Sequence, residues 1–364
     1  MERSLLQELT DKRLKAYLER NRFTARYWAS MLPLEFRDEL TWESLQGSEG
    51  STIKADVIAY DSSAPEKGRE IIGKASGRIA KMALKRSMRE EDFLMYKRLK
   101  KGAASDSERQ AILDLVFNDI NFVVEAVNAN TEYLALQAIS TGEISLGKAN
   151  NNGIITETAV DLGIPKGNKT TVSVLPSKTA EFDFIAEIKK ISKKARAERG
   201  VKLNYMFTDP DTIDAILASA KIKEAYGYFL TQTHKPFLGT LFLDQLNALL
   251  KKNRLPELIE IDTFVRHEDS NHKRTTLQPW RQGYITLSVE KTFGKMQHGP
   301  IAEEDAESVK KYAIQAKKGH CLVTKFSQVD PVVEWTKGEA HAFPVLKGVE
   351  DIFILNTNST SKFI

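Results

Sequence analysis

The feature that most constrains the fold is a helical pattern that runs without proline from residue 105 to residue 141. Apolar side chains recur along it every three or four residues, which places them on one face of a helix. They are Leu113, Val116, Phe117, Ile120, Val123, Val124, Val127, Leu134 and Ala138. A capping box, Ser105-x-x-Glu108, opens the pattern, and Gly142 follows it. The predicted helix is roughly 50 Å long. That length exceeds what a small domain needs and suits a spine.

Composition places the chain among ordinary globular proteins. With 364 residues, 41% of them hydrophobic, it can bury a substantial core, and we expect two or three folding units. The 53 basic and 49 acidic residues nearly balance, so no strong overall field holds a polyanion. The single cysteine, Cys321, lies in an apolar run and cannot form a disulfide within the chain, which suits a reducing cytoplasm. We expect neither a secretory signal nor a membrane span.

The N-terminal residues predict an amphipathic helix with little to pack on. Residues 5–30 place leucines and aromatic residues among abundant charge, and Pro33 follows as a break. The apolar face is thin and has no evident partner in the neighbouring sequence. We therefore expect this segment to be an arm that lies on another surface.

A long β-ribbon is expected next. Residues 52–61 and 71–84 have β-like patterns, and the segment that joins them is rich in turn-forming residues. The second run is dominated by lysine and arginine and carries few large apolar groups. Because a ribbon of two strands is at best marginally stable in water, this one should need a surface to lie on.

The rest of the chain predicts a mixed α/β arrangement. A short helix is expected over residues 90–101, closed by Gly102, and residues 143–175 are β-like. Asp209 is a predicted N-cap with Pro210 at the first helical position. Further helices are expected at 179–199, closed by Gly200, at a segment that begins at residue 210, and at 241–252. Further strands are expected at 201–207, 258–265, 284–289 and within 319–356. A polar loop is expected at 266–278.

One segment imitates a phosphate-binding loop. Residues 142–149 fit G-x-x-x-x-G-K, but Ala149 stands where such a loop needs serine or threonine to bind magnesium. The segment also follows a helix, whereas a phosphate-binding loop must follow a strand and open a helix. The pattern therefore favours a helix end and a turn over nucleotide binding.

Catalytic and metal-binding patterns are weak. Of the six histidines only His267 and His272 are close together, five residues apart in a polar segment, which is poor spacing for zinc. The sequence matches no G-x-S-x-G, H-E-x-x-H or G-x-G-x-x-G template. We predict no catalytic residue, no metal site and no cofactor, and we do not expect an enzyme.

The segment 67–101 is strongly basic, with twelve lysines and arginines against four acidic residues. It could form a phosphate-binding stripe, so a nucleic-acid-binding protein is one possible interpretation. Aromatic residues for stacking on bases are not interleaved with its basic run. A charged ribbon that meets an acidic face of a partner is the favoured interpretation.

Three groups of motifs carry a resemblance to a known family. The first comprises Gly47-x-x-Gly50, Ala55-Asp56-Val57-Ile58-Ala59-Tyr60-Asp61-Ser62, Ala64-Pro65-x-x-x-Arg69 and Arg89-Glu90-Glu91-Asp92. The second comprises Trp280-x-x-Gly283-Tyr284-Ile285-Thr286-Leu287, Phe293-Gly294 and Gly299-Pro300. The third comprises Asp330-Pro331-x-x-Glu334-x-Thr336-x-Gly338-Glu339-Ala340-x-Ala342-x-Pro344 and Asp351-Ile352-Phe353-Ile354-Leu355. Their order resembles tailed-bacteriophage major capsid proteins of the lambda-type capsid protein E family.

The resemblance implies an α+β fold of the HK-ninety-seven-like phage capsid type. Its parts would be an N-terminal arm, an extended β-hairpin called the E-loop, a peripheral domain with a spine helix, and a mixed α/β axial domain. The implied boundaries are 1–46 for the arm, 47–92 for the E-loop, 93–178 for the peripheral domain, 179–318 for the axial domain and 319–364 for the return strands.

The resemblance also implies a function. The chain would assemble with itself, as pentamers and hexamers, into the icosahedral head shell that encloses double-stranded DNA. The E-loop residues expected to contact neighbouring subunits are Asp61, Pro65, Arg69, Lys74 and Arg78. An encapsulin-type nanocompartment shell protein is an alternative with the same fold.

Further implied partners are a portal, a separate scaffold or maturation protease, a decoration protein, and packaged DNA without sequence specificity. About 46 residues precede the hairpin, too few for a fused scaffolding segment. We expect assembly in the host cytoplasm and a final location in the virion, without membrane contact.

Overall fold

The computed structural model describes residues 4, 9–46, 73–102, 106–147, 158–232, 236–269 and 271–361. The chain forms two compact units. The first unit comprises Met1–Trp42, Ser76–Glu132 and Lys295–Pro344. The second comprises Glu43–Ala75, Tyr133–Gly294 and Val345–Ile364. Each unit is thus assembled from segments that are far apart in the sequence.

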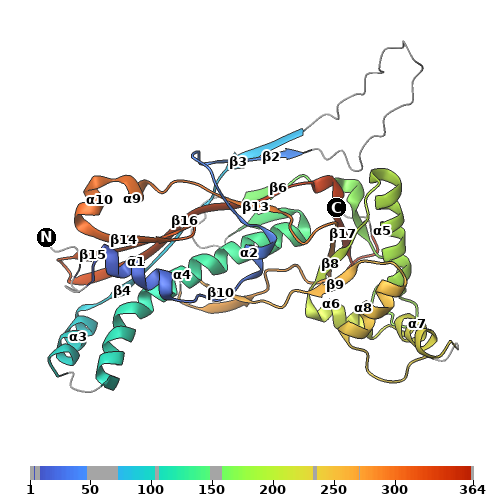
Figure 1. Cartoon of the computed structure of the whole chain (residues 1–364), viewed down its shortest axis with the longest axis horizontal. Helices are drawn as coiled ribbons and strands as arrows, with labels where there is room; N and C mark the ends of the chain where they lie inside the picture. The colour runs from blue at the N-terminus through green and yellow to red at the C-terminus, as the bar shows by residue number, and fades with distance from the viewer. Residues whose placement is uncertain are drawn as a thin grey trace, which may run out of the picture. The chain divides into compact units, whose positions relative to one another are not determined.

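The first unit is built on most of a six-stranded sheet. Its strands are β1 (Leu34–Phe36), β4 (Lys81–Met88), β13 (Gly294–His298), β14 (Ala313–Lys318), β15 (Cys321–Gln328) and β16 (Val333–Leu346). Its helices are α1 (Asp11–Arg20), α2 (Tyr27–Met31), α3 (Glu90–Gly102), the longer part of α4 (Asp106–Thr141), α9 (Ala302–Asp305) and α10 (Glu307–Tyr312). The strand order is β1-β13-β16-β15-β14, and β4 also pairs with β16 (Figure 1).

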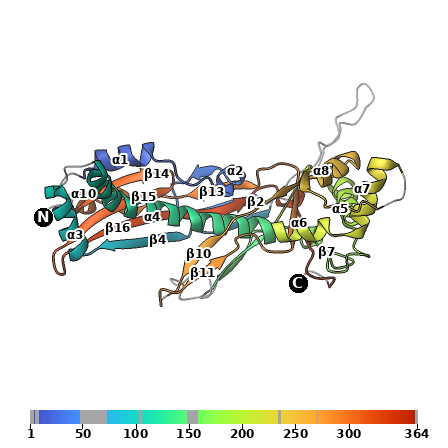
Figure 2. The same cartoon turned by 90° about the horizontal axis from the view of Figure 1, so that it is seen from below.

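The predicted spine helix is confirmed as α4, which has 36 residues. It lies across one face of the sheet (Figure 2). The helix approaches the sheet closely at Gly338 of β16, where a Cβ atom would lie 2.9 Å from both the Cβ and the carbonyl oxygen of Val123. Only glycine therefore lets the helix lie this close to the strand.

The N-terminal segment packs on its own subunit, and the prediction of a single helix without a partner is wrong. The structure has two short helices, α1 and α2, separated by extended backbone. Leu14 and Leu18 of α1 are fully buried. Tyr17 stacks on Phe117 of α4 with ring centroids 4.0 Å apart, and Asp11 accepts a hydrogen bond from the Gln315 backbone N–H of β14 at 2.7 Å.

The second run of the predicted ribbon is divided between two partners. Strand β3 (Gly73–Arg78) pairs with β2 (Thr41–Gln46), and β4 runs antiparallel to β16. Met82 and Met88 of β4 are buried. The expectation that this whole run lacks a partner within the chain is therefore wrong for β4. The first run, residues 52–61, lies outside the described residues.

The second unit contains a five-stranded mixed sheet. Its strands are β7 (Lys169–Thr171), β8 (Tyr205–Thr208), β9 (Glu257–Glu260), β12 (Tyr284–Ser288) and β17 (Phe353–Asn356), in the order β7-β17-β12-β8-β9. Four helices are associated with it: α5 (Phe184–Arg199), α6 (Pro210–Leu217), α7 (Ala220–Thr231) and α8 (Leu243–Lys252). They share one apolar core with Ile285 and Leu287 of β12 and Phe353 and Leu355 of β17.

The last turns of α4 cover the opposite face of this sheet. Side chains alternate along a strand, so Thr286 points away from the core that holds Ile285 and Leu287. Its hydroxyl donates to the Ile139 carbonyl at 2.9 Å. Gly142 ends the helix in the left-handed conformation (φ 73°). This confirms the helix-end interpretation of the residues that imitate a phosphate-binding loop.

Local signals were reliable for most other elements. Asp209 caps α6 through its hydrogen bond from Thr212, and Gly200 (φ 67°) ends α5, as predicted. The predicted polar loop at 266–278 is wrong, because β10 (Val265–Glu268) and β11 (Arg274–Leu277) form a hairpin there. A second hairpin joins β5 (Glu143–Leu146) to β6 (Thr158–Asp161). Helices α7, α9 and α10 and strands β1, β2, β13 and β14 were not anticipated.

The close packing of α4 on β16 gives a direct test. Gly338→Ala should lower the free energy of unfolding by about 1–3 kcal/mol, because the added methyl group overlaps Val123. Gly102→Ala is the matched control, since no atom lies within 4 Å of the added Cβ atom. Denaturant unfolding of both variants measures the difference. Equal stability of the two would contradict the packing described here.

Candidate assembly surfaces

The base of the ribbon is fixed to the first unit by an aromatic contact. Trp42 at the start of β2 stacks on Phe343 of β16, with centroids 5.2 Å apart and planes 14° apart. Gly77 of β3 lies against the indole ring, where a Cβ atom would be 2.7 Å from Nε1. Trp42 is buried. The sequence analysis missed this contact. Its only sign in the local sequence is one tryptophan, Trp42, at some distance from a strand that contains a glycine, Gly77.

The structure describes two of the five predicted contact residues. Lys74 and Arg78 lie on the same strand, β3, and Arg78 is exposed. Asp61, Pro65 and Arg69 lie outside the described residues. The grouping of all five on one contact surface therefore stays a prediction.

An ionic network joins the other face of the first sheet to helix α9. Lys337 lies next to Gly338 in β16 and so points away from α4. Its ammonium group contacts the carboxylates of Glu303 and Glu339. Lys81 of β4 also contacts Glu339, at 2.9 Å. These contacts lower the pKa of Glu339 although its burial acts to raise it.

A fully buried ion pair lies on the α4 face of the same sheet. The Lys325 ammonium is 3.4 Å from a Glu334 carboxylate oxygen, and it also donates to the Thr336 hydroxyl at 2.9 Å. Ser4 donates to the same Glu334 oxygen at 2.7 Å. A buried pair of this kind is tolerated only when its members are satisfied, and losing one partner is strongly destabilising. Glu334 and Thr336 are thus structural members of the third motif group.

The N-terminus of α2 is capped by a side chain of α4. Arg26, the residue before α2, provides no side-chain cap. Instead the buried Glu132 carboxylate accepts hydrogen bonds from the Tyr27 and Trp28 N–H groups at 3.0 and 2.8 Å. Burial raises the pKa of Glu132, and these hydrogen bonds partly offset the effect. The cap satisfies two N–H groups that a helix leaves free.

His320 completes this attachment of the N-terminal segment. It lies in the turn between β14 and β15, with Nε2 2.9 Å from the Thr131 hydroxyl and the ring edge-on to Trp28 at 5.2 Å. Burial, with lesser effects from His298 and Lys317, lowers the pKa of His320 to about 4. The histidine therefore stays neutral within the folded subunit at neutral pH.

The second motif group also has a structural role. Gly283 adopts φ 78°, and its N–H donates to the buried Asp209 carboxylate at 3.0 Å. The Thr357 N–H donates to the Gly283 carbonyl at 2.8 Å. Trp280 is buried and donates through Nε1 to the Tyr284 carbonyl at 2.8 Å. These residues hold the end of β12 to the cap of α6.

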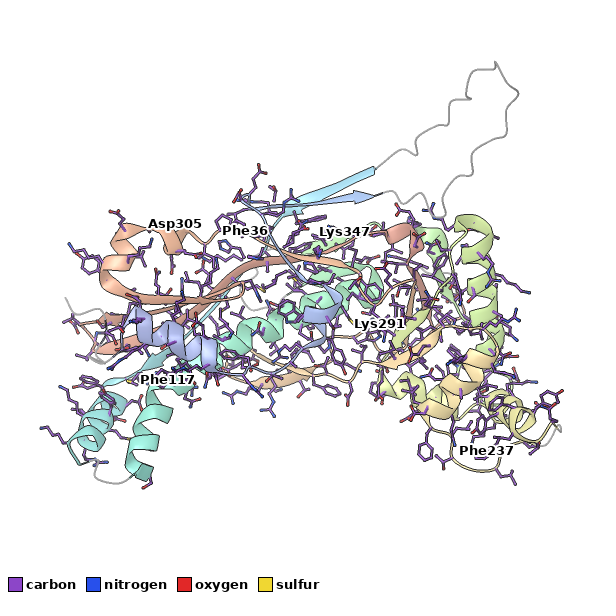
Figure 3. All side chains as sticks on the ribbon, viewed as in Figure 1. Phe36, Phe117, Phe237, Lys291, Asp305 and Lys347 are labelled. Carbon is purple, nitrogen blue, oxygen red and sulfur yellow. The ribbon has the colours of Figure 1, made fainter. Side chains whose placement is uncertain are left out.

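Large apolar side chains are exposed in both units, and the sequence analysis did not single them out. Figure 3 labels Phe36 of β1, which is exposed, in the first unit, and Phe237, which is partly buried against the core and precedes α8, in the second. Leu34 and Leu40 near Phe36 are also exposed, as are Leu238, Phe242 and Tyr228 near Phe237. Exposed apolar side chains gathered in one segment are candidates for contact with other molecules.

Within the described ranges, no group of three or more His, Cys, Asp and Glu side chains is placed to hold a metal ion. His272 contacts Glu268 at 2.9 Å on the β10–β11 hairpin, and His267 lies on β10. Cys321 is buried, which raises the pKa of its thiol to about 12. No helix among the residues placed by the structure is long and apolar enough to cross a membrane.

Comparison with known families decides the interpretation. Residues 46–245, more than half of the 364-residue chain, match the family described as phage major capsid protein E. The chain belongs to this family. The predicted resemblance is thereby confirmed, and this capsid protein is a structural shell subunit. A comparison with curated proteins finds no match.

Two solved structures share the fold of the capsid protein. A putative prophage capsid protein from E. coli CFT073 is 15% identical with a TM-score of 0.59, covering 96% of this chain and 99% of that one. A phage-related protein from Bordetella bronchiseptica RB50 is 13% identical with a TM-score of 0.55, covering 96% and 97%. At these identities the likeness bears on the fold alone, and it confirms the predicted HK-ninety-seven-like class.

The environment of His320 predicts a pH dependence of the free capsid subunit. Unfolded histidine has a pKa near 6.5 and the folded residue about 4, so the unfolded state binds an extra proton between these values. Stability is therefore full above pH 6.5 and falls by about 3 kcal/mol as the pH drops to 4.

His320→Gln should remove this loss of stability at low pH. His272→Gln, at an exposed histidine, should leave the loss unchanged. Denaturant unfolding at pH 7.5 and pH 4.5 measures both variants. If His320→Gln loses as much stability as the wild type between pH 7.5 and pH 4.5, another group is responsible for the pH dependence.

Proposed function

We propose that this capsid protein builds the icosahedral head shell of a tailed phage around double-stranded DNA, using the segment 47–92 to reach neighbouring copies. The observation that carries the proposal is the family match over residues 46–245. That match includes the whole predicted ribbon and the whole spine helix. A structural role also fits buried polar side chains such as Glu132 and Lys325, which are engaged in a helix cap and an ion pair.

The ribbon is suited to contacts between copies because its base is anchored. Trp42, Gly77 and Phe343 fix where β2 and β3 leave the first unit. Arg78 is exposed and directly follows Gly77 at this anchor, and Lys74 lies four residues earlier on the same strand. An anchored base reduces the entropy lost when the remaining residues dock on a neighbour. Asp61, Pro65 and Arg69 are the other proposed contact residues.

Many weak contacts are sufficient for such a shell. Heterologous contacts repeated around closed rings generate pentamers and hexamers, and each contact gains from all the others. The proposed partners beyond the chain itself are a portal, a separate scaffold or maturation protease, a decoration protein, and DNA bound without sequence specificity. Assembly would take place in the host cytoplasm, and the product would be part of the virion.

Charge reversal of the ribbon tests the proposal. Arg69→Glu combined with Arg78→Glu should abolish particles in negative-stain images while the subunit stays folded and soluble. The opposite charge would face the same partner surface, and like charges at a contact are repulsive. Arg69→Lys with Arg78→Lys is the matched control and should still form particles.

Normal particles from the charge-reversed variant would refute the contact role of the ribbon. Particles that carry cargo enzymes in place of DNA would instead support the encapsulin alternative. A wild-type chain that stays monomeric and binds DNA with a steep salt dependence would support the nucleic-acid-binding alternative.

A further inference from the structure

The second unit carries an apolar knob formed by Leu238 and Phe242. These side chains are 95% and 63% exposed, in the segment between α7 and α8. The segment is held in place, because Phe237 packs edge-on against Tyr226 at 5.2 Å and its N–H donates to the Lys223 carbonyl at 3.0 Å. Leu241 is buried in the core. Leu238 is thus exposed on an anchored loop, in which Figure 3 labels the neighbouring Phe237.

The same unit carries a separate groove between α5, α7 and α8. Its volume is about 560 Å³, a size suited to large apolar side chains. Apolar lining comes from Ile185, Ala225 and Phe229. Three lysines also line it, Lys189, Lys221 and Lys252, against the two carboxylates of Asp183 and Glu224. The groove therefore combines an apolar lining with a small excess of positive charge.

We propose that the knob of one copy docks in the groove of a second copy. The inference rests on the proposed function, because a shell subunit must offer surfaces to other copies of itself. Knob and groove are different parts of one unit, so the contact is heterologous and repeats around a ring. Asp244, exposed two residues after Phe242, places a carboxylate beside the knob, opposite in sign to the three lysines of the groove.

The exposure pattern supports this occupant. Single exposed leucines are common on protein surfaces, but here Leu238 and Phe242 lie in one short segment with no charged residue between them. Tyr228, 46% exposed, lines the groove itself. A contact between copies would remove the apolar side chains on both surfaces from water at once.

Disulfide trapping tests the contact in assembled particles of the full chain. One copy carries Leu238→Cys and one affinity tag, and a second carries Ala225→Cys and a different tag. Native Cys321 does not interfere, because it is buried and its thiol pKa is about 12. Oxidation should link the two tags in one disulfide-bonded dimer on a non-reducing gel. Val329→Cys, at an exposed apolar residue of the first unit, is the control for Leu238→Cys.

A second measurement does not depend on the groove variant. Leu238→Asp should raise the concentration needed for assembly at least about tenfold, and Val329→Asp should leave it within about twofold. Lys221→Cys, on the exposed side of α7, replaces Ala225→Cys if that variant fails to fold.

The outcomes separate the two proposals. Particles that contain both tagged chains but yield no more mixed dimer than the Val329→Cys control overturn the knob-and-groove contact and leave the shell function intact. Dimers that join two Leu238→Cys chains also overturn it, because the knobs would then meet each other. If the unsubstituted chain forms no particles under any assembly condition, the proposed function fails and the contact fails with it.

Discussion

The contact between helix α4 and strand β16 is the interaction on which the first unit depends. Gly338 lets the helix approach the sheet at Val123, and β16 pairs with β15 on one side and β4 on the other. The N-terminal segment then packs against surfaces that this contact creates. The Glu132 cap and the Tyr17 stacking both come from α4. A change at the helix–sheet contact would therefore affect elements far from it in sequence.

Features set by local chemistry could be predicted from the sequence. The apolar spacing within 105–141 predicts α4, and Asp209 and Gly200 mark helix ends that the structure confirms. Long-range partners could not be predicted. Leu14 and Leu18 are buried beside β14, about 300 residues further along the chain, and β4 finds its partner β16 at a similar distance in sequence. No local pattern carries that information.

The same limit explains why the expected placement of two segments was wrong although the family assignment was right. The N-terminal arm and the predicted ribbon were expected to lie on other surfaces because they had no evident partners near them in sequence. The structure supplies partners within the chain for the arm and for β4, so these two segments are no sign of assembly. The order of the motif groups carried the correct assignment, and their described residues Gly283, Glu334, Thr336 and Gly338 have structural roles.

We infer a separation between a subunit body that is formed in the free chain and surfaces that are covered only in the shell. Hydrogen exchange measured by mass spectrometry on the free subunit and on assembled particles tests this separation most directly. We expect the amides of α1, α4, β4 and β16 to be protected in both states. Residues 73–80 and 236–242 should gain protection only in particles. Protection of α1 and β4 that arises only on assembly, with no change at 73–80 and 236–242, would contradict the account.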